Sequence, residues 1–329
     1  GCGAKKAESS AAESTAATGT AAESTAAAKT ETGTGLRGGA LKGPTAMGLV
    51  NLMQDSQDGK SEGKYEFSIA SQPDEVASKL VSGELDLALL PANMASALYN
   101  KTEGKIAVVN INTLGVLYCV SGDTNIHGVQ DLAGKTVYTT GQGATPEYVL
   151  RYLLKENGVT DCNLEFKSEP TEIASLLAAD ATAIAVLPQP FVTVAEAKNE
   201  QLKTAFSLTD AWDSLNNGSR LVTGVTVVRK DVLESRPAEV ANFITEQERS
   251  AATAVEDVDR TAARVVAFGI LENEGIAKKA LPDCNITAIT GEEMKKALSG
   301  YLNVLYEADP KAVGGKLPDD AFYAVTEAK

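Results

Sequence analysis

The hydrophobic and polar positions divide this chain into two unlike parts. Residues 3–35 contain no Leu, Ile, Val, Met, Phe, Tyr, Trp or Pro, and the heptamer AAESTAA occurs there twice. A segment with no apolar side chains to bury cannot offset the entropy that its backbone loses on ordering. The pattern therefore predicts that residues 1–35 form a disordered tether and that the folded part begins at residue 36.

From residue 36, short apolar runs alternate with segments of helical periodicity. The run LDLALLP at 85–91 is almost continuously apolar, which is typical of a strand covered on both faces in a parallel sheet. This alternation favours a doubly wound α/β domain. The pattern predicts strands at 36–42, 65–70, 85–91, 106–110 and 115–120, and helices at 46–55, 71–84 and 92–99.

The alternation restarts after residue 130. A turn at 131–137 leads into a strand, and the glycine-bearing loop TTGQGAT then leads into a new helix. After Arg229 the chain is expected to be nearly all helical. The second series predicts strands at 163–167, 182–187, 203–207 and 221–228, and helices at 146–157, 171–178, 189–197, 237–255, 260–271, 292–307 and 319–326.

The two series predict an α/β fold of two doubly wound lobes joined by two crossover strands. The crossings are expected near 120–122 and 222–225. Residues 36–120 plus 225–329 would then form the first lobe, and residues 121–224 the second. Strand ends and helix starts of both lobes would line a ligand cleft between them.

The composition excludes several classes of function. Thirty basic and forty-four acidic residues give a formal charge of −14, which suits neither nucleic acid nor anionic lipid headgroups. The single histidine, His127, lies among turn-forming residues, so we expect it to be exposed and exclude His-rich metal sites. The chain has neither a P-loop nor a dinucleotide-binding glycine motif. We therefore expect no metal and no cofactor.

The cysteines suggest a lipid anchor rather than a disulfide framework. Cys2 follows Gly1 and opens the low-complexity segment, as in a lipoprotein, so we expect it to carry a lipid at the extracytoplasmic face of the cell membrane. The long tether favours a Gram-positive surface over a periplasm. The alternative is that Cys2 is an ordinary free thiol. Cys119, Cys162 and Cys284 show no CxxC spacing and are expected to be inert thiols, although pairing of Cys162 with Cys284 stays open.

Five segments, in this order and spacing, resemble a known family. They are GPT, LDLALLPAN, DLAGKTVYTTGQGATPEYVLRYLL, AIAVLPQPFVT and GVTVVRKDVLESRPAEVANFI. From about residue 36 to the end, the chain is similar to substrate-binding proteins of ABC importers, above all the nitrate, sulfonate and taurine group, with thiamine-precursor binders as relatives. The resemblance implies a type II periplasmic binding protein fold, and a monomer that closes on a small solute and docks on an ABC permease.

Four turns at strand ends are the candidate ligand-binding site that this resemblance implies. Backbone amides at the helix start after TTGQGAT would suit an anionic group, and Lys42 would supply a nearby positive charge. Thr45, Asn93 and Thr145 are equally suited to capping helices. The candidate residues are Lys42, Pro44, Thr45, Pro91, Ala92, Asn93, Thr140, Gln142, Gly143, Ala144, Thr145, Pro188 and Gln189.

The residue types at these turns favour holding a molecule over transforming it. Lys42 and Glu147 are the candidate acids or bases near the predicted cleft, and its other residues are Thr, Gln, Asn and backbone groups. We therefore expect no catalytic residues and a solute-binding lipoprotein that is not an enzyme. The alternative is an enzyme that acts on a small molecule in the cleft of the same fold.

Overall fold

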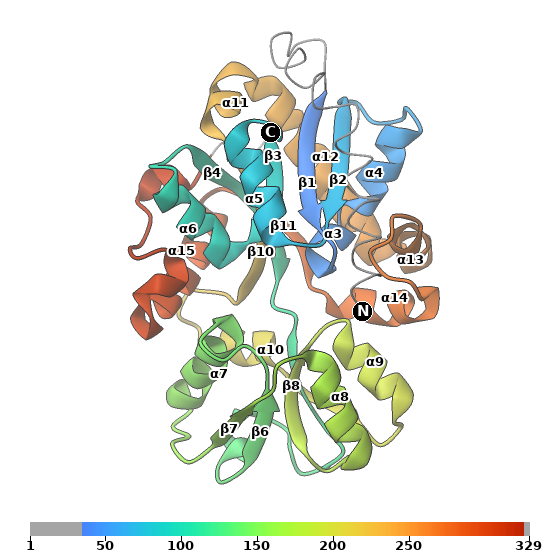
Figure 1. The fold of residues 1–329 in the computed structure, drawn as a ribbon, viewed down its shortest axis with the longest axis vertical. Helices are drawn as coiled ribbons and strands as arrows, with labels where there is room; N and C mark the ends of the chain where they lie inside the picture. The colour runs from blue at the N-terminus through green and yellow to red at the C-terminus, as the bar shows by residue number, and fades with distance from the viewer. Residues whose placement is uncertain (1–34, 326–329) are drawn as a thin grey trace.

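The computed structural model describes residues 35–325, which form two lobes (Figure 1). Each lobe is built around one sheet, and the chain passes between the lobes twice. The first-lobe strands are β1 (Leu36–Leu41), β2 (Tyr65–Ala70), β3 (Leu87–Pro91), β4 (Ile106–Leu114), β10 (Val222–Arg229) and β11 (Ile286–Ile289). The second-lobe strands are β5 (Leu117–Ser121), β6 (Thr136–Thr139), β7 (Asn163–Phe166), β8 (Ile184–Pro188) and β9 (Lys203–Ser207).

The two sheets share one plan. Their strand orders are β11-β4-β10-β3-β1-β2 and β7-β6-β8-β5-β9. In each, three strands are parallel, and the strand that has just crossed from the other lobe inserts next to them in the antiparallel direction: β10 beside β3, and β5 beside β8. This arrangement confirms the predicted α/β fold with two crossovers.

Helices cover both sheets and are drawn in Figure 1. Several start at a proline, where the missing N–H would have no intrahelical partner in any case. Their bounds are α3 (Pro44–Met47), α4 (Val50–Gln57), α5 (Pro73–Ser82), α6 (Ala92–Lys101), α7 (Thr145–Glu156), α8 (Pro170–Ala179), α9 (Phe191–Lys198), α10 (Leu208–Asp213), α11 (Lys230–Ser235), α12 (Pro237–Glu256), α13 (Val258–Ala267), α14 (Glu274–Ala280) and α15 (Gly291–Ala308).

Strand β3 is buried on both faces, as its apolar run predicts. Leu87 and Leu89 pack into one core cluster, whereas Ala88 and Leu90 pack into the other. Alternate side chains of a strand point to opposite faces of the sheet, so helices must cover both faces here. Full burial of each leucine contributes roughly 1.5–3 kcal/mol. Strand β3 is thus a rigid support for the residues that follow it.

The first crossing lies earlier than the sequence predicts. Strand β4 continues to Leu114 and β5 begins at Leu117, so Gly115 and Val116 form the crossing instead of 120–122. A Cβ atom on Gly115 would lie 2.2 Å from Oγ1 of Thr209. Only glycine allows the chain to pass so close to α10, and no apolar pattern signals that constraint.

Three further expectations differ from the structure. The helix predicted at 46–55 is interrupted near Gly48, which separates α3 from α4, and the helix at 319–326 is a single 3-10 turn over Asp320–Phe322. The region after Arg229 is nearly all helical, as predicted, but it also contains the unpredicted strand β11, which pairs antiparallel with β4 at the edge of the first sheet. A strand as short as β11 gives little periodicity of its own and depends on β4 for its hydrogen bonds.

The three cysteines in the described part of the chain are free thiols. Cys162 and Cys284 are therefore not joined. Burial raises the pKa of Cys119 and that of Cys284 to about 12, so both thiols stay protonated and unreactive at neutral pH. Cys2 lies outside the described residues. Between residues 35 and 325, no helix combines the length and apolar character needed to cross a membrane.

Candidate functional site

A cavity of about 190 Å³ lies where the two lobes meet the two crossings. One wall comes from the end of β3 and the start of α6, the facing wall from the start of α7, and another part from α15. Since both lobes and both crossings contribute, the cavity exists only in the assembled fold. Its lining residues are Pro91, Asn93, Val116, Leu117, Thr145, Pro146, Leu221, Val222, Thr223 and Tyr301.

The first-lobe wall presents a polar side chain that has no partner. Pro91 precedes the first turn of α6, where no side chain caps the helix, so Asn93 does not have the capping role that its residue type allows. Asn93 is half-buried, and its amide group makes no hydrogen bond with any other described residue. Its donor and acceptor are therefore available to a molecule in the cavity.

The second-lobe wall differs from the expected anion site. Helix α7 begins at Thr145, but the N–H of Gly143 donates to the carboxylate of Glu147 at 2.7 Å. Nε of Arg151 donates to the other oxygen of that carboxylate, also at 2.7 Å. Burial raises the pKa of Glu147, but the Gly143 and Arg151 hydrogen bonds outweigh burial and lower it overall. The positive helix end thus already holds an anion, which belongs to the chain itself.

Tyr301 reaches the cavity from α15 and was not foreseen. It is 2 % exposed, and its hydroxyl lies near the side chain of Thr145, which belongs to the other lobe. Burial raises the pKa of Tyr301, and the neighbouring Thr145 side chain opposes only part of that rise. The hydroxyl is therefore protonated at neutral pH. No sequence signal marks Tyr301, since it occupies a regular apolar position of a long helix far along the chain.

Aromatic packing fixes Tyr301 in place. Its ring centroid lies 5.7 Å from that of Trp212, which lies 4.6 Å from that of Tyr152. The indole Nε1 of Trp212 donates to Ser219 at 2.8 Å. Because these rings come from α7, α10 and α15, residues of both lobes pack against Tyr301 and hold it at the cavity.

The first-lobe turn predicted around Lys42 lies outside the cavity lining. Lys42 is exposed, and Pro44 starts α3. Thr45 does not cap α3 but lies against Gly224, where a Cβ atom would be 2.7 Å from Thr45 Cγ2 and 2.7 Å from Asn112 Oδ1. Lys42 does not line the cavity, so it does not supply the positive charge that was expected to bind an anion there.

The other predicted residues divide between structural and exposed positions. Gln189 is buried, and its side-chain oxygen accepts hydrogen bonds from the N–H and hydroxyl of Thr193, which fixes the start of α9. The cavity is lined by Pro91, Asn93 and Thr145 from the predicted set. Those that do not line it are Lys42, Pro44, Thr45, Ala92, Thr140, Gln142, Gly143, Ala144, Pro188 and Gln189.

Two tyrosines of the second lobe fasten it to the first. The hydroxyl of Tyr118 donates to the carbonyl oxygen of Asp283 at 2.7 Å, and that of Tyr148 donates to Oδ2 of Asp309 at 2.9 Å. Neither residue lines the cavity. These bonds hold the lobes in the arrangement that forms it. Among the described residues, Tyr301 is the one aromatic side chain that lines the cavity.

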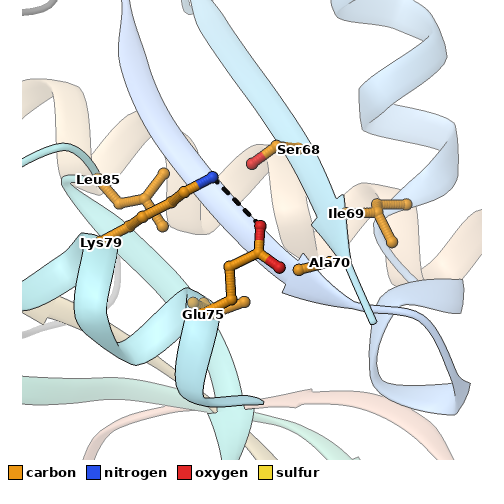
Figure 2. Close-up of a pocket in the computed structure, with 7 residues that line it drawn as sticks. Ser68, Ile69, Ala70, Glu75, Lys79 and Leu85 are labelled. Carbon is orange, nitrogen blue, oxygen red and sulfur yellow. Dashed lines mark hydrogen bonds and ion pairs between the residues drawn. The ribbon is translucent and has the colours of Figure 1, made fainter. Parts of the chain in front are cut away.

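Two other hollows are less suitable as sites. The one in Figure 2 lies between β2 and α5 and has about 10 Å³ of space, room for about one water molecule, beside the Lys79–Glu75 ion pair. The other, of about 430 Å³, lies between the end of α6 and residues 316–319. It does not involve the second lobe. Among residues 35–325, no group of three or more His, Cys, Asp or Glu side chains is placed to hold a metal ion.

Fold and cavity together define a two-lobed protein of the type II periplasmic binding protein fold with a small-molecule cleft. The chain belongs to a family described as menaquinone biosynthesis, whose sequence model matches residues 44–307. Since that family comprises biosynthetic enzymes on this fold, the expectation that this chain is not an enzyme is wrong. No curated protein is significantly similar to the chain in sequence.

Solved structures of transport proteins and of an enzyme share this fold. It is similar to an ABC transporter from Parabacteroides distasonis, with 26% identity, a TM-score of 0.76, and coverage of 89% of this chain and 100% of that one. It shares its fold with the periplasmic aliphatic sulphonate binding protein SsuA from Escherichia coli (16% identity, TM-score 0.66, 89% and 94% covered). The desulfurization enzyme DszB also has this fold (12% identity, TM-score 0.58, 88% and 96% covered).

Proposed function

We propose that this chain is an enzyme that acts on a small molecule held in the cavity between its lobes. The observation that carries the proposal is the unpartnered amide of Asn93, which lines the same interlobe cavity as Thr145 and Tyr301. The family match supports it, because residues 44–307 include every residue that lines the cavity.

The cavity residues limit the chemistry. Tyr301 is the one titratable residue in the lining, and its raised pKa keeps it a hydrogen-bond donor. Together with Asn93, it can donate to an oxygen of the bound molecule and stabilise negative charge that develops there. Surrounding apolar residues exclude water and strengthen these interactions. The geometry thus suits a reaction that polarises a carbonyl or hydroxyl oxygen.

A second candidate function is capture of a solute for an ABC permease. The likeness to the Parabacteroides distasonis ABC transporter over the whole of that chain favours it. In this case Cys2 would carry the lipid anchor at the outer face of the membrane, and the ligand class of the nitrate, sulfonate and taurine group would be the first to test. Both candidates use the same cavity and differ in whether the bound molecule is changed.

Native mass spectrometry of the full chain, followed by incubation with each compound it retains, tests the proposal. We expect mass spectrometry to detect conversion of the retained compound, and Tyr301→Phe to slow it at least ~10-fold, the scale of one lost transition-state hydrogen bond. Tyr306→Phe, on the same helix but outside the cavity, should convert at the normal rate. A retained compound that stays unchanged would favour the receptor function.

A further inference from the structure

We propose that residues 309–316 form a strap that ties the second lobe to helix α6, with Asp309 as its releasable joint. The strap follows α15 directly, and none of its residues lines the cavity. It connects α6, α7 and α15, the three helices that contribute residues to the cavity lining. The strap would therefore set how far apart the cavity walls lie, whichever molecule the cavity binds.

Asp309 uses the two oxygens of one carboxylate for two different elements. Its Oδ2 accepts a hydrogen bond at 2.9 Å from the hydroxyl of Tyr148, which belongs to α7 of the second lobe. Its Oδ1 accepts one at 3.0 Å from the backbone N–H of Lys311, which caps the 3-10 turn Pro310–Val313 of the strap. Because one carboxylate makes both bonds, the conformation of the strap depends on the position of α7.

The other end of the strap is fixed to α6 by hydrogen bonds and close packing. The hydroxyl of Ser96 donates to the carbonyl oxygen of Val313 at 2.7 Å, and both residues are fully buried. Nδ2 of Asn100 donates to the carbonyl oxygen of Lys316 at 2.9 Å. Gly314 has a φ of +89°, and a Cβ atom there would lie 2.6 Å from a backbone atom of α6. A displacement of the strap should therefore displace α6 as well.

The two tyrosines that join the lobes differ in their access to water. Tyr118 is 8 % exposed and donates to the backbone carbonyl oxygen of Asp283. Tyr148 and Asp309 are both half-buried, so water can compete for the hydrogen bond between them. The Tyr148–Asp309 bond can thus open locally while both lobes stay folded.

Hydrogen exchange of the full chain, followed amide by amide with NMR, tests the strap. Tyr148→Phe keeps the ring and removes only the hydroxyl. Exchange at the amides of Ala312 and Gly314, which are bonded within the strap, should become ~10-fold faster, the scale of one lost hydrogen bond to a charged group. The amide of Thr102, which ends α6, should exchange faster as well.

Tyr118→Phe is the matched control, because it removes the other interlobe tyrosine hydroxyl and leaves Asp309 unchanged. Exchange at Ala312 and Gly314 should not change in this variant. Asp309→Ala loses both carboxylate bonds, so it should speed exchange at the strap at least as much as Tyr148→Phe. Thermal unfolding of each variant checks that it is folded.

Three results would overturn the proposal. Unchanged strap exchange in Tyr148→Phe would mean that Asp309 only caps its own turn. Faster exchange at the strap but not at Thr102 would mean that α6 is not tied to the second lobe. Equal acceleration in Tyr118→Phe would mean that the strap only follows a general loosening of the lobes. Each of these results would leave the proposed function standing, because conversion of a bound compound is measured separately.

Discussion

The two ends of strand β3 differ in whether their polar side chains have partners within the protein. Just before it, Asp86 is 1% exposed and is surrounded by arginines: it accepts from Arg37 at 2.9 Å and Arg229 at 3.0 Å, and Arg236 lies at 3.9 Å. Just after it, Asn93 enters the cavity without a partner. Asp86 and its arginines form hydrogen bonds and ion pairs with one another, whereas the amide of Asn93 keeps a donor and an acceptor available in the cavity.

The position of each region explains this difference. In open α/β sheets, ligands bind beyond the carboxyl ends of the parallel strands, which is where Asn93 lies. Asp86 lies at the opposite end of β3, where Arg229 also ends the antiparallel strand β10. The most strongly interacting charges are therefore structural, and the residues that line the proposed site are neutral. A search for the densest cluster of titratable residues would find the wrong end of the sheet.

The largest expected effect comes from Asp86→Asn. Removing the carboxylate leaves buried guanidinium groups without their shared counter-charge, so the free energy of unfolding should fall by ~3–5 kcal/mol. Urea unfolding measures it. Asp213→Asn is the control, since its pair with Arg220 is about one-third exposed and should cost below ~1 kcal/mol. Equal effects of the two substitutions would contradict a structural role for the Asp86 cluster.

Gly224→Ala should have the next largest effect. Its new Cβ atom would approach Thr45 Cγ2 and Asn112 Oδ1 at 2.7 Å, and Asn112 is anchored by a hydrogen bond to Thr226. We expect the free energy of unfolding to fall by ~1–3 kcal/mol, as for other overpacked interiors. Gly224 also pairs with Pro91 of the cavity wall, so binding of the compound that native mass spectrometry shows the chain to retain should weaken too.

Gly128→Ala is the matched control for Gly224→Ala. Gly128 has an extended backbone, and no atom lies within 4 Å of the position of its Cβ. Its free energy of unfolding should change by no more than ~0.5 kcal/mol. Full stability of Gly224→Ala would mean that Thr45 and Asn112 can move apart, and that the first-lobe wall is not rigid.

Asn93→Leu should separate binding from stability. Since Asn93 has no protein partner to lose, the free energy of unfolding should stay within ~0.5 kcal/mol of the original value. Affinity for the compound that native mass spectrometry shows the chain to retain should nevertheless fall ~10-fold, or about 1.4 kcal/mol. Parallel urea unfolding and calorimetry measure the two quantities. A large loss of stability would place Asn93 among the structural residues with Asp86.

The smallest expected effect is that of Glu147→Gln, and it depends on pH. The folded-state pKa of Glu147 lies below its usual value of 4.5, so the carboxylate contributes stability above that value and loses it as the pH falls through the folded pKa. At pH 7 the substitution should lower the free energy of unfolding by ~0.3–1 kcal/mol. The difference in unfolding free energy between Glu147→Gln and the original chain should vanish below the folded-state pKa of Glu147. A difference that persisted there would contradict the conclusion that the ionised carboxylate stabilises the start of α7.

The sequence predicts the parts of this fold that depend on local patterns. The apolar run that becomes β3 and the prolines that open α5 and α12 are visible without a structure. The first crossing at Gly115 and the short strand β11 are not, because both depend on contacts with distant segments. Local periodicity carries no information about such contacts.

The site was partly predictable for the same reason. Pro91, Asn93 and Thr145 follow from the rule that ligands lie beyond strand ends. Tyr301 reaches the cavity only because α15 packs across the lobe boundary. The anion site expected at the start of α7 stays a prediction; there the carboxylate of Glu147 folds back and accepts a hydrogen bond from the N–H of Gly143. The prediction that the chain is not an enzyme relied on the lack of an evident acid or base, and a buried tyrosine gives no such signal.

Chemical-shift mapping of the full, isotopically labelled chain, during a titration with the compound that native mass spectrometry shows it to retain, tests the central claim most directly. The account predicts that the largest changes occur at the backbone amides of Asn93, Leu117, Thr145 and Thr223, which belong to both lobes and both crossings. Changes confined to the hollow beside Tyr99, or no saturable changes at all, would contradict the assignment of the interlobe cavity as the functional site.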